Sequence, residues 1–174
     1  MKLRASCLIV GLASLVASLQ QQSLAQTPAA AATRLTLTGA AFICANQVET
    51  GTCPNAEFDP ALGSIQNPQG TWAANVSLPD GTVVSGLRLC GNFNEDGSSI
   101  TATLDRTPLT AASGFASPVA MASVQSAGAS DQTQCFKTNL ISDATINNAA
   151  NQYYVVVVVP DNDGVIFTTV QILY

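Results

Sequence analysis

The sequence predicts an all-β protein: a disulfide-bonded antiparallel β-sandwich of jelly-roll-like type, with about eight or nine strands. Short runs rich in β-branched residues alternate apolar with polar side chains, as strands with one buried face do. Turn residues separate these runs at intervals of roughly eight to twelve positions. No segment shows the 3.6-residue period of an amphipathic helix.

The first 25 residues have the features of a secretory signal peptide. A basic start precedes an apolar run from Cys7 to Leu19, which is too short to span a bilayer. Ser23-Leu24-Ala25 has the small-x-small form of a cleavage site. We therefore expect a secreted chain that begins at Gln26, without membrane insertion, in an extracellular, periplasmic or cell-surface location.

The charge balance of the expected mature chain is acidic. Lys2 and Arg4 leave with the signal peptide, so four basic residues remain against eleven acids, a net charge of −7. The four are Arg34, Arg88, Arg106 and Lys137. Nucleic acids and anionic membranes require clustered positive charge, so neither is an expected partner.

Residues 26–33 are alanine-rich and predict a flexible leader, followed by a single domain over 34–174. The first strand begins at Arg34, where leucine alternates with threonine, and it continues beyond Gly39 to Cys44. Residues 45–70 hold six glycines and prolines, which predict a long surface loop.

The middle of the chain predicts a hairpin and three further strands. Thr71–Leu78 alternates with Trp72 on its apolar face, and Pro79-Asp80-Gly81 is a turn that leads into Thr82–Phe93. A strand through Ile100, Ala102 and Leu104 ends at Pro108, and two more follow around Gly128. The three segments are 100–105, 119–126 and 132–140.

The C-terminal 22 residues predict a second hairpin. Five consecutive valines, 155–159, do not alternate with polar residues, so they predict a strand covered on both faces. Residues 160–164 form a turn, and Val165–Tyr174 returns as the partner strand. An uncharged strand at a sheet edge would pair with another chain, but we favour burial by neighbouring strands within one subunit.

Four cysteines remain after cleavage, and an even number in an oxidising compartment predicts two disulfides. Of the three pairings, we favour Cys44–Cys53, which closes a short loop, with Cys90–Cys135 joining distant strands. Zinc is the alternative, but the cysteines include no close Cys-x-x-Cys pair.

From about Trp72 to Tyr174 the chain resembles a recurrent, uncharacterised module of secreted bacterial proteins. The resemblance rests on turn and core positions, and it implies a β-sandwich without catalytic residues. The segment around Cys44 and Cys53 departs from that pattern. The matching stretches are Leu78-Pro79-Asp80-Gly81, the strand through Leu87 and Leu89, 92–96, 100–104, 122–123, 126–130, Ser142-Asp143-Ala144-Thr145-Ile146-Asn147-Asn148 and Tyr153-Tyr154.

Histidine is absent from the chain, which removes the commonest general base, metal ligand and partner of a nucleophile. We therefore expect no enzyme activity and no catalytic or cofactor-binding residue. The enzymatic alternative is a carboxylate pair of the glycosidase kind. Its candidate residues are Glu49, Glu57, Asp59, Glu95 and Asp96.

Residues 92–97 match the first half of a calcium-binding loop, with oxygen ligands from Asn92, Asn94 and Asp96 and a glycine at the sixth position. The second half fails, because Thr103 stands where the bidentate acid belongs. An ion-free acidic turn is the favoured interpretation, and calcium is the only cofactor hypothesis that the sequence offers.

The sequence thus favours a secreted, non-enzymatic structural or interaction module, at the cell surface or in the extracellular matrix, with self-association as one mode of assembly. The alternative function is a lectin-like module that binds a ligand through the end loops 45–70, 92–98 and 161–164, with or without calcium. Its partner would be a surface glycan or protein.

Overall fold

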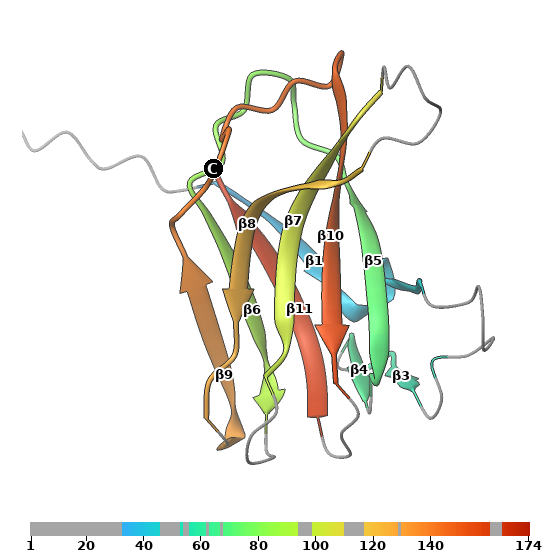
Figure 1. The fold of residues 1–174 in the computed structure, drawn as a ribbon. Helices are drawn as coiled ribbons and strands as arrows, with labels where there is room; N and C mark the ends of the chain where they lie inside the picture. The colour runs from blue at the N-terminus through green and yellow to red at the C-terminus, as the bar shows by residue number, and fades with distance from the viewer. Residues whose placement is uncertain are drawn as a thin grey trace, which may run out of the picture. The chain divides into compact units, whose positions relative to one another are not determined.

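Two antiparallel sheets pack face to face around a common core (Figure 1). This computed structural model describes residues 33–45, 53, 56–61, 63–66, 68–93, 99–109, 117–128, 130–160 and 165–174, with the side chains of Ser130 and Asp131 excepted. These residues belong to one compact unit, Ala31–Tyr174. No helix within the described ranges has the length and apolarity to cross a membrane.

The six-stranded sheet has the order β3-β4-β11-β6-β9, and β1 also pairs with β11. Its strands are β1 (Arg34–Thr38), β3 (Glu57–Asp59), β4 (Ser64–Gln66), β6 (Gly86–Phe93), β9 (Ser130–Thr138) and β11 (Val165–Leu173). The five-stranded sheet has the order β2-β5-β10-β7-β8. Its strands are β2 (Ile43–Cys44), β5 (Gly70–Val76), β7 (Thr101–Pro108), β8 (Val119–Gln125) and β10 (Asn151–Val159).

The predicted disulfide-bonded β-sandwich is confirmed, although the described residues form eleven strands where eight or nine were expected. The additional strands are short. A 3-10 turn, Gly39–Ala41, interrupts the first predicted strand and moves the chain from β1 in one sheet to β2 in the other. Within the predicted loop 45–70, β3 and β4 form a small hairpin in which Phe58 is paired with Ile65.

Both long hairpins predicted from turn residues are wrong, because the chain changes sheet where a hairpin was expected. Strand β10 pairs with β5 and β7, whereas β11 pairs with β1, β4 and β6. Strands β5 and β6 also lie in different sheets, and Ser85 before β6 donates its N–H to Leu173 O at 2.7 Å. Turn residues set where the chain reverses, but two buried inner faces are available to the strand that follows.

The expectation that the five-valine strand is covered on both faces is also wrong. Val155, Val157 and Val159 are buried in the core, but Val158 is 45% exposed and Val156 is half-buried on the outer face. Strand β10 lies at the centre of its sheet with a partner on each side, so its backbone is not an edge for another chain. The exposed feature of this strand is therefore its outer side-chain row.

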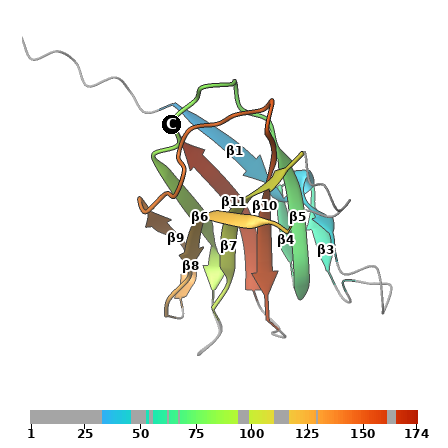
Figure 2. The same cartoon turned by 45° about the horizontal axis from the view of Figure 1, so that its top comes forward.

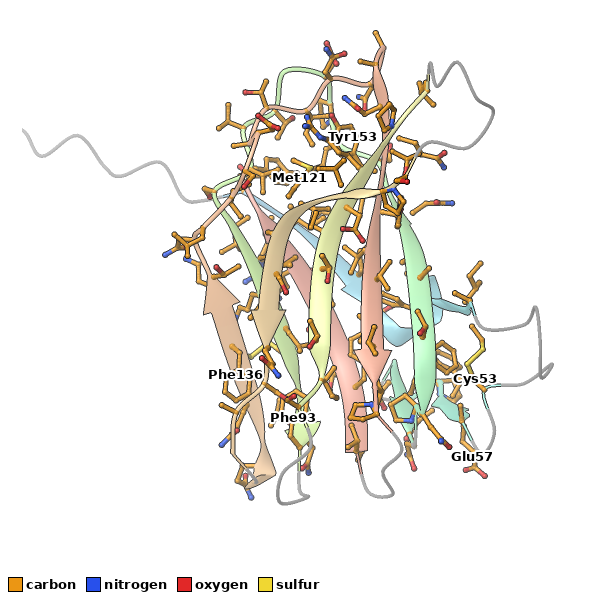
Figure 3. All side chains as sticks on the ribbon, in the orientation of Figure 1. Cys53, Glu57, Phe93, Met121, Phe136 and Tyr153 are labelled. Atoms are coloured by element: carbon orange, nitrogen blue, oxygen red, sulfur yellow. A yellow bond between two sulfur atoms is a disulfide. The ribbon has the colours of Figure 1, made fainter. Side chains whose placement is uncertain are left out.

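The inward-facing side chains of both sheets form the hydrophobic core between them. Trp72 is buried, as its apolar row predicts, and its Nε1 donates to Pro68 O at 2.6 Å. Phe93 and Phe136 pack with ring centroids 5.6 Å apart at one end of the six-stranded sheet (Figure 3).

The two disulfides have the predicted pairing. Cys44–Cys53 connects β2 to the residues that precede β3. Cys90 and Cys135 are direct partners on β6 and β9, and their disulfide joins the outer faces of these two strands.

Candidate interaction surfaces

The predicted calcium ligands are only partly described. Asn92 lies on β6, opposite Ile166 of β11, whereas Asn94 and Asp96 lie outside the described residues. Within the described part of the chain, no group of three or more histidine, cysteine, aspartate or glutamate side chains is placed to hold a metal ion. The calcium hypothesis therefore remains a prediction.

The carboxylates proposed for a glycosidase are likewise only partly described. Glu57 and Asp59 lie on β3, whereas Glu49, Glu95 and Asp96 lie outside the described residues. Asp59 accepts a hydrogen bond from the Ala61 N–H at 2.8 Å, so its carboxylate supports the β3–β4 turn. Figure 3 shows Glu57 on the same short strand at the margin of the sandwich.

Two of the loops assigned to the lectin-like alternative are flanked by strand ends that pair with each other. Phe93 at the end of β6 pairs with Val165 at the start of β11, so the segments 94–98 and 161–164 leave the sheet from adjacent positions. These segments are themselves outside the described residues.

The outer face of the five-stranded sheet, here called the β10 face, is open to solvent. The strand registers, together with the alternation of inward and outward positions, identify the side chains on this face. They are Ile43 on β2; Thr71, Ala73 and Asn75 on β5; Gln152, Tyr154, Val156 and Val158 on β10; Thr101, Thr103, Asp105 and Thr107 on β7; and Ala120, Ser123 and Gln125 on β8. The face carries no basic side chain and a single acid. Figure 1 shows β5, β10, β7 and β8 side by side in this layer, and Figure 2 shows the same strands with the top of the molecule turned forward.

Asp105 is the unusual member of the β10 face. It is only 9% exposed, and burial raises the pKa of its carboxyl group above the ordinary value of 3.8. Its cross-strand neighbours are Tyr154 and Ala120, and no hydrogen bond or ion pair from any described residue reaches the carboxylate. Burial without a hydrogen-bond donor favours the protonated form of a carboxyl group. A partner bound at this surface could instead supply the missing donor.

The end of the sandwich formed by residues 77–85 and 139–150 is polar and tightly connected. Asn148 donates its backbone N–H to Asp80 Oδ1 at 2.8 Å and its Nδ2 to Leu78 O at 2.9 Å. Asn147 donates its N–H to the Tyr153 hydroxyl at 2.8 Å. These residues belong to the stretches that carry the resemblance to secreted modules, and their contacts hold two loops together.

A polar pocket at the same end is lined by Arg106, Asp143, Thr145, Asn147 and Asn151, among others. Arg106 forms an ion pair with Asp143, which has a positive φ of 48°. Aspartate is one of the few non-glycine residues that adopt the left-handed region readily, and the ion pair helps to hold Asp143 there.

A second, apolar pocket lies beside β3 and is lined by Phe42, Phe58, Ile65 and Trp72, with Gly39, Ala40 and Ala56. Phe58 is 48% exposed at its rim, so this pocket is an accessible apolar surface at the opposite sheet margin from β9.

No family model matches this chain, and no curated protein shows significant sequence similarity to it.

The predicted alternation through Ile100, Ala102 and Leu104 leaves Asp105 on the outward row of its strand, but it does not reveal that Asp105 is buried. The signal was weak, because the outward partners that cover it, Tyr154 and Ala120, come from segments far away in sequence. The openness of the β10 face was missed because valine at every position concealed the alternation that polar residues normally reveal.

Proposed function

We propose that this chain is a secreted, non-enzymatic structural or interaction module at the cell surface or in the extracellular matrix, and that it self-associates through the β10 face. Secretion is supported by the N-terminal pattern of residues 1–25 and by two disulfides, which persist in oxidising compartments. The resemblance over 72–174 is a further reason to place the chain among secreted β-sandwich modules.

The observation that carries this proposal is the composition of the β10 face. The expected mature chain has a net charge of −7, so two copies repel one another over most of their surfaces. The β10 face offers one carboxylate among the described residues of its five strands, and that group is already partly desolvated. Two copies meet there with the least electrostatic cost and cover Val156 and Val158.

Self-association through this face should depend on pH. Face-to-face pairing brings two Asp105 carboxyl groups into one layer, where the neutral form is favoured. Self-association should therefore strengthen as the pH falls through the raised pKa of Asp105, and the Asp105→Asn variant should associate with little dependence on pH.

The test is the solution mass of the oxidised chain, residues 26–174, measured by light scattering over a range of concentrations. Val158→Lys places a charge on the β10 face and should give a monomer. The matched control is Val83→Lys, because Val83 is 59% exposed and lies outside both sheets. A wild-type chain that stays monomeric at every concentration and pH would contradict self-association, as would equal effects of the two lysines.

The second candidate is the lectin-like module, favoured by the pairing of Phe93 with Val165, which sets the ends of two acidic loops side by side. Its test is the melting temperature with calcium and then with chelator. A rise with calcium that chelator reverses supports an ion in these loops, and an unchanged melting temperature counts against it.

A further inference from the structure

Three of the four basic residues after position 26 lie on the outer face of the six-stranded sheet, opposite the β10 face. Arg34 on β1 is the register partner of Leu173 on β11, and Arg88 on β6 is the partner of both Gln171 on β11 and Lys137 on β9. We call this surface the cationic patch. Its residues are Arg34, Thr36, Gly86, Arg88, Lys137, Asn139, Gln171 and Leu173.

Arg88 and Lys137 are held directly opposite each other. Cys90 and Cys135, two residues further along the same strands, have Cα atoms 4.2 Å apart, the spacing of the narrow type of antiparallel pair. Pairs two residues apart are of the same type, so the side chains of Arg88 and Lys137 emerge close together. Like charges in this arrangement destabilise a sheet, and the disulfide keeps the strands from slipping out of it.

The side chain of Lys137 extends across β6. Its Cε lies 3.0 Å from where a Cβ on Gly86 would be, and Leu173 Cδ1 lies 3.1 Å from the same point. The missing side chain at Gly86 therefore leaves the space that the lysine stem occupies. Since Gly86 pairs with Leu173, and Leu173 pairs with Arg34, the lysine stem extends from the β9 edge over β6, on the side of the sheet where Arg34 lies.

These three cations have no acidic partner among the described residues. The ion pair found there is Arg106–Asp143, at the end of the sandwich. In addition, the side-chain oxygen of Gln171, between Thr36 and Arg88, is buried and accepts no hydrogen bond from the described part of the chain. Among the described residues, the patch thus combines cations that have no acidic partner with a buried oxygen that accepts no hydrogen bond.

We propose that the cationic patch binds an acidic polysaccharide, whose carboxylates engage Arg34, Arg88 and Lys137. A sugar hydroxyl group that reached the Gln171 oxygen would supply the donor that this oxygen lacks among the described residues. The patch crosses four strands, so the backbone positions of Arg34 and Lys137 lie roughly 14 Å apart, three inter-strand spacings. This spread suits a polymer that carries one carboxylate per sugar.

Two other partner classes fit less well. A protein partner needs an apolar centre, and the exposed large apolar side chains of the described residues all lie outside the patch. Nucleic acid carries about one charge per 1.7 Å of duplex and, when single-stranded, relies on aromatic stacking. The patch has no aromatic residue, and a chain of net charge −7 repels so dense a polyanion.

The experiment measures binding of polygalacturonate to the oxidised chain, residues 26–174, by calorimetry at low and physiological salt, with neutral dextran and poly-dT as comparison polymers. We expect binding to polygalacturonate alone, with an affinity that falls as salt increases. The double variant Arg88→Gln/Lys137→Gln should bind at least about tenfold more weakly, while Arg88→Lys retains binding.

The matched control is Ser77→Asp/Ser117→Asp, which lowers the net charge by the same two units at exposed positions outside both the cationic patch and the β10 face. It should bind polygalacturonate nearly as well as the wild type. Equal losses in both double variants would show an effect of net charge alone and overturn the proposal, and so would binding of poly-dT as tight as that of polygalacturonate. If the neutralised double variant melts early, Arg34→Gln on β1 supplies the same test.

Discussion

Asp105 and Arg106 are consecutive residues of β7 whose side chains leave opposite faces of the five-stranded sheet. Arg106, opposite the buried Tyr153, forms an ion pair with Asp143, whereas Asp105, opposite Tyr154, lies on the β10 face without a described partner. One strand thus carries a compensated charge at the end of the sandwich and an uncompensated one in the middle of a sheet. The second kind costs stability while the carboxylate is ionised, because burial penalises the charged form.

The uncompensated acid predicts a specific dependence of stability on pH. Because the folded-state pKa of Asp105 lies above its unfolded value, the folded chain binds this proton more tightly. The stability that this group contributes is fully present below the unfolded pKa of 3.8 and is lost as the pH rises through the folded pKa.

Asp105→Asn should therefore raise the melting temperature at neutral pH, by roughly 2–4 °C for each kcal/mol of desolvation relieved, and remove this component of the pH profile. The measurement is thermal unfolding from about pH 3.5 to 7, at concentrations where the chain is monomeric. Glu57→Gln, a change at an exposed acid of β3, is the control and should leave the profile intact. A less stable Asp105→Asn variant at neutral pH would show that the carboxylate is stabilising after all.

The ion pair at the polar end predicts a contrast between two substitutions of Asp143. Its side chain is 64% exposed, so the loss of the ion pair in Asp143→Asn should cost less than about 1 kcal/mol. Asp143→Ala loses the same charge and must also hold alanine at a φ of 48°, which asparagine tolerates better. We expect alanine to cost roughly 1 kcal/mol more than asparagine in urea unfolding. Equal costs would mean that the loop relaxes out of the left-handed region.

The two disulfides predict unequal losses of stability. The Cys90–Cys135 disulfide closes a loop with a sequence separation of 45 residues, whereas the Cys44–Cys53 loop has a separation of 9 residues. In the chain-entropy model these loops correspond to about 4 and about 3 kcal/mol. Replacing both cysteines of a pair by serine and measuring urea unfolding should give the larger loss for Cys90–Cys135. The opposite order would indicate that native contacts around β2 and β3 dominate over loop entropy.

The elements that sequence reasoning located were those whose information is local. Alternation identified β5 and the inward residues of β7, and the breakers at Gly39 and Pro108 marked real interruptions. Which strand pairs with which could not be inferred from local sequence. Pro79-Asp80-Gly81 turns the chain in the way its residues predict, but whether the next strand joins the same sheet depends on which inner face remains to be filled.

The candidate surfaces depended even more on long-range register. The cysteine pairs could be predicted because loop length and compartment limit the choices. The convergence of Arg34, Arg88 and Lys137 could not, since it requires the strand order β1-β11-β6-β9 and the empty position at Gly86. From the sequence alone these residues are three isolated charges in an acidic chain.

Two glycines of β6, Gly86 and Gly91, should differ in their tolerance of substitution by alanine, although neither has a positive φ. A Cβ on Gly91 would lie 2.5 Å from the backbone oxygen of Ile166 and 3.0 Å from the Phe93 ring. The backbone of the neighbouring strand cannot move away without disturbing the β6–β11 pairing. Gly91→Ala should therefore destabilise the fold by about 1–3 kcal/mol, as overpacking of a filled site does.

Gly86→Ala is the comparison, because its nearest atom is the flexible Cε of Lys137 at 3.0 Å. The lysine can move, so this variant should unfold in urea with a midpoint close to that of the wild type, while Gly91→Ala unfolds earlier. The same displacement should weaken polygalacturonate binding, since it removes the space over β6 that the lysine stem occupies. A Gly86→Ala chain that is stable and binds the polymer with unchanged affinity would show that the position of the lysine stem over β6 does not matter for recognition.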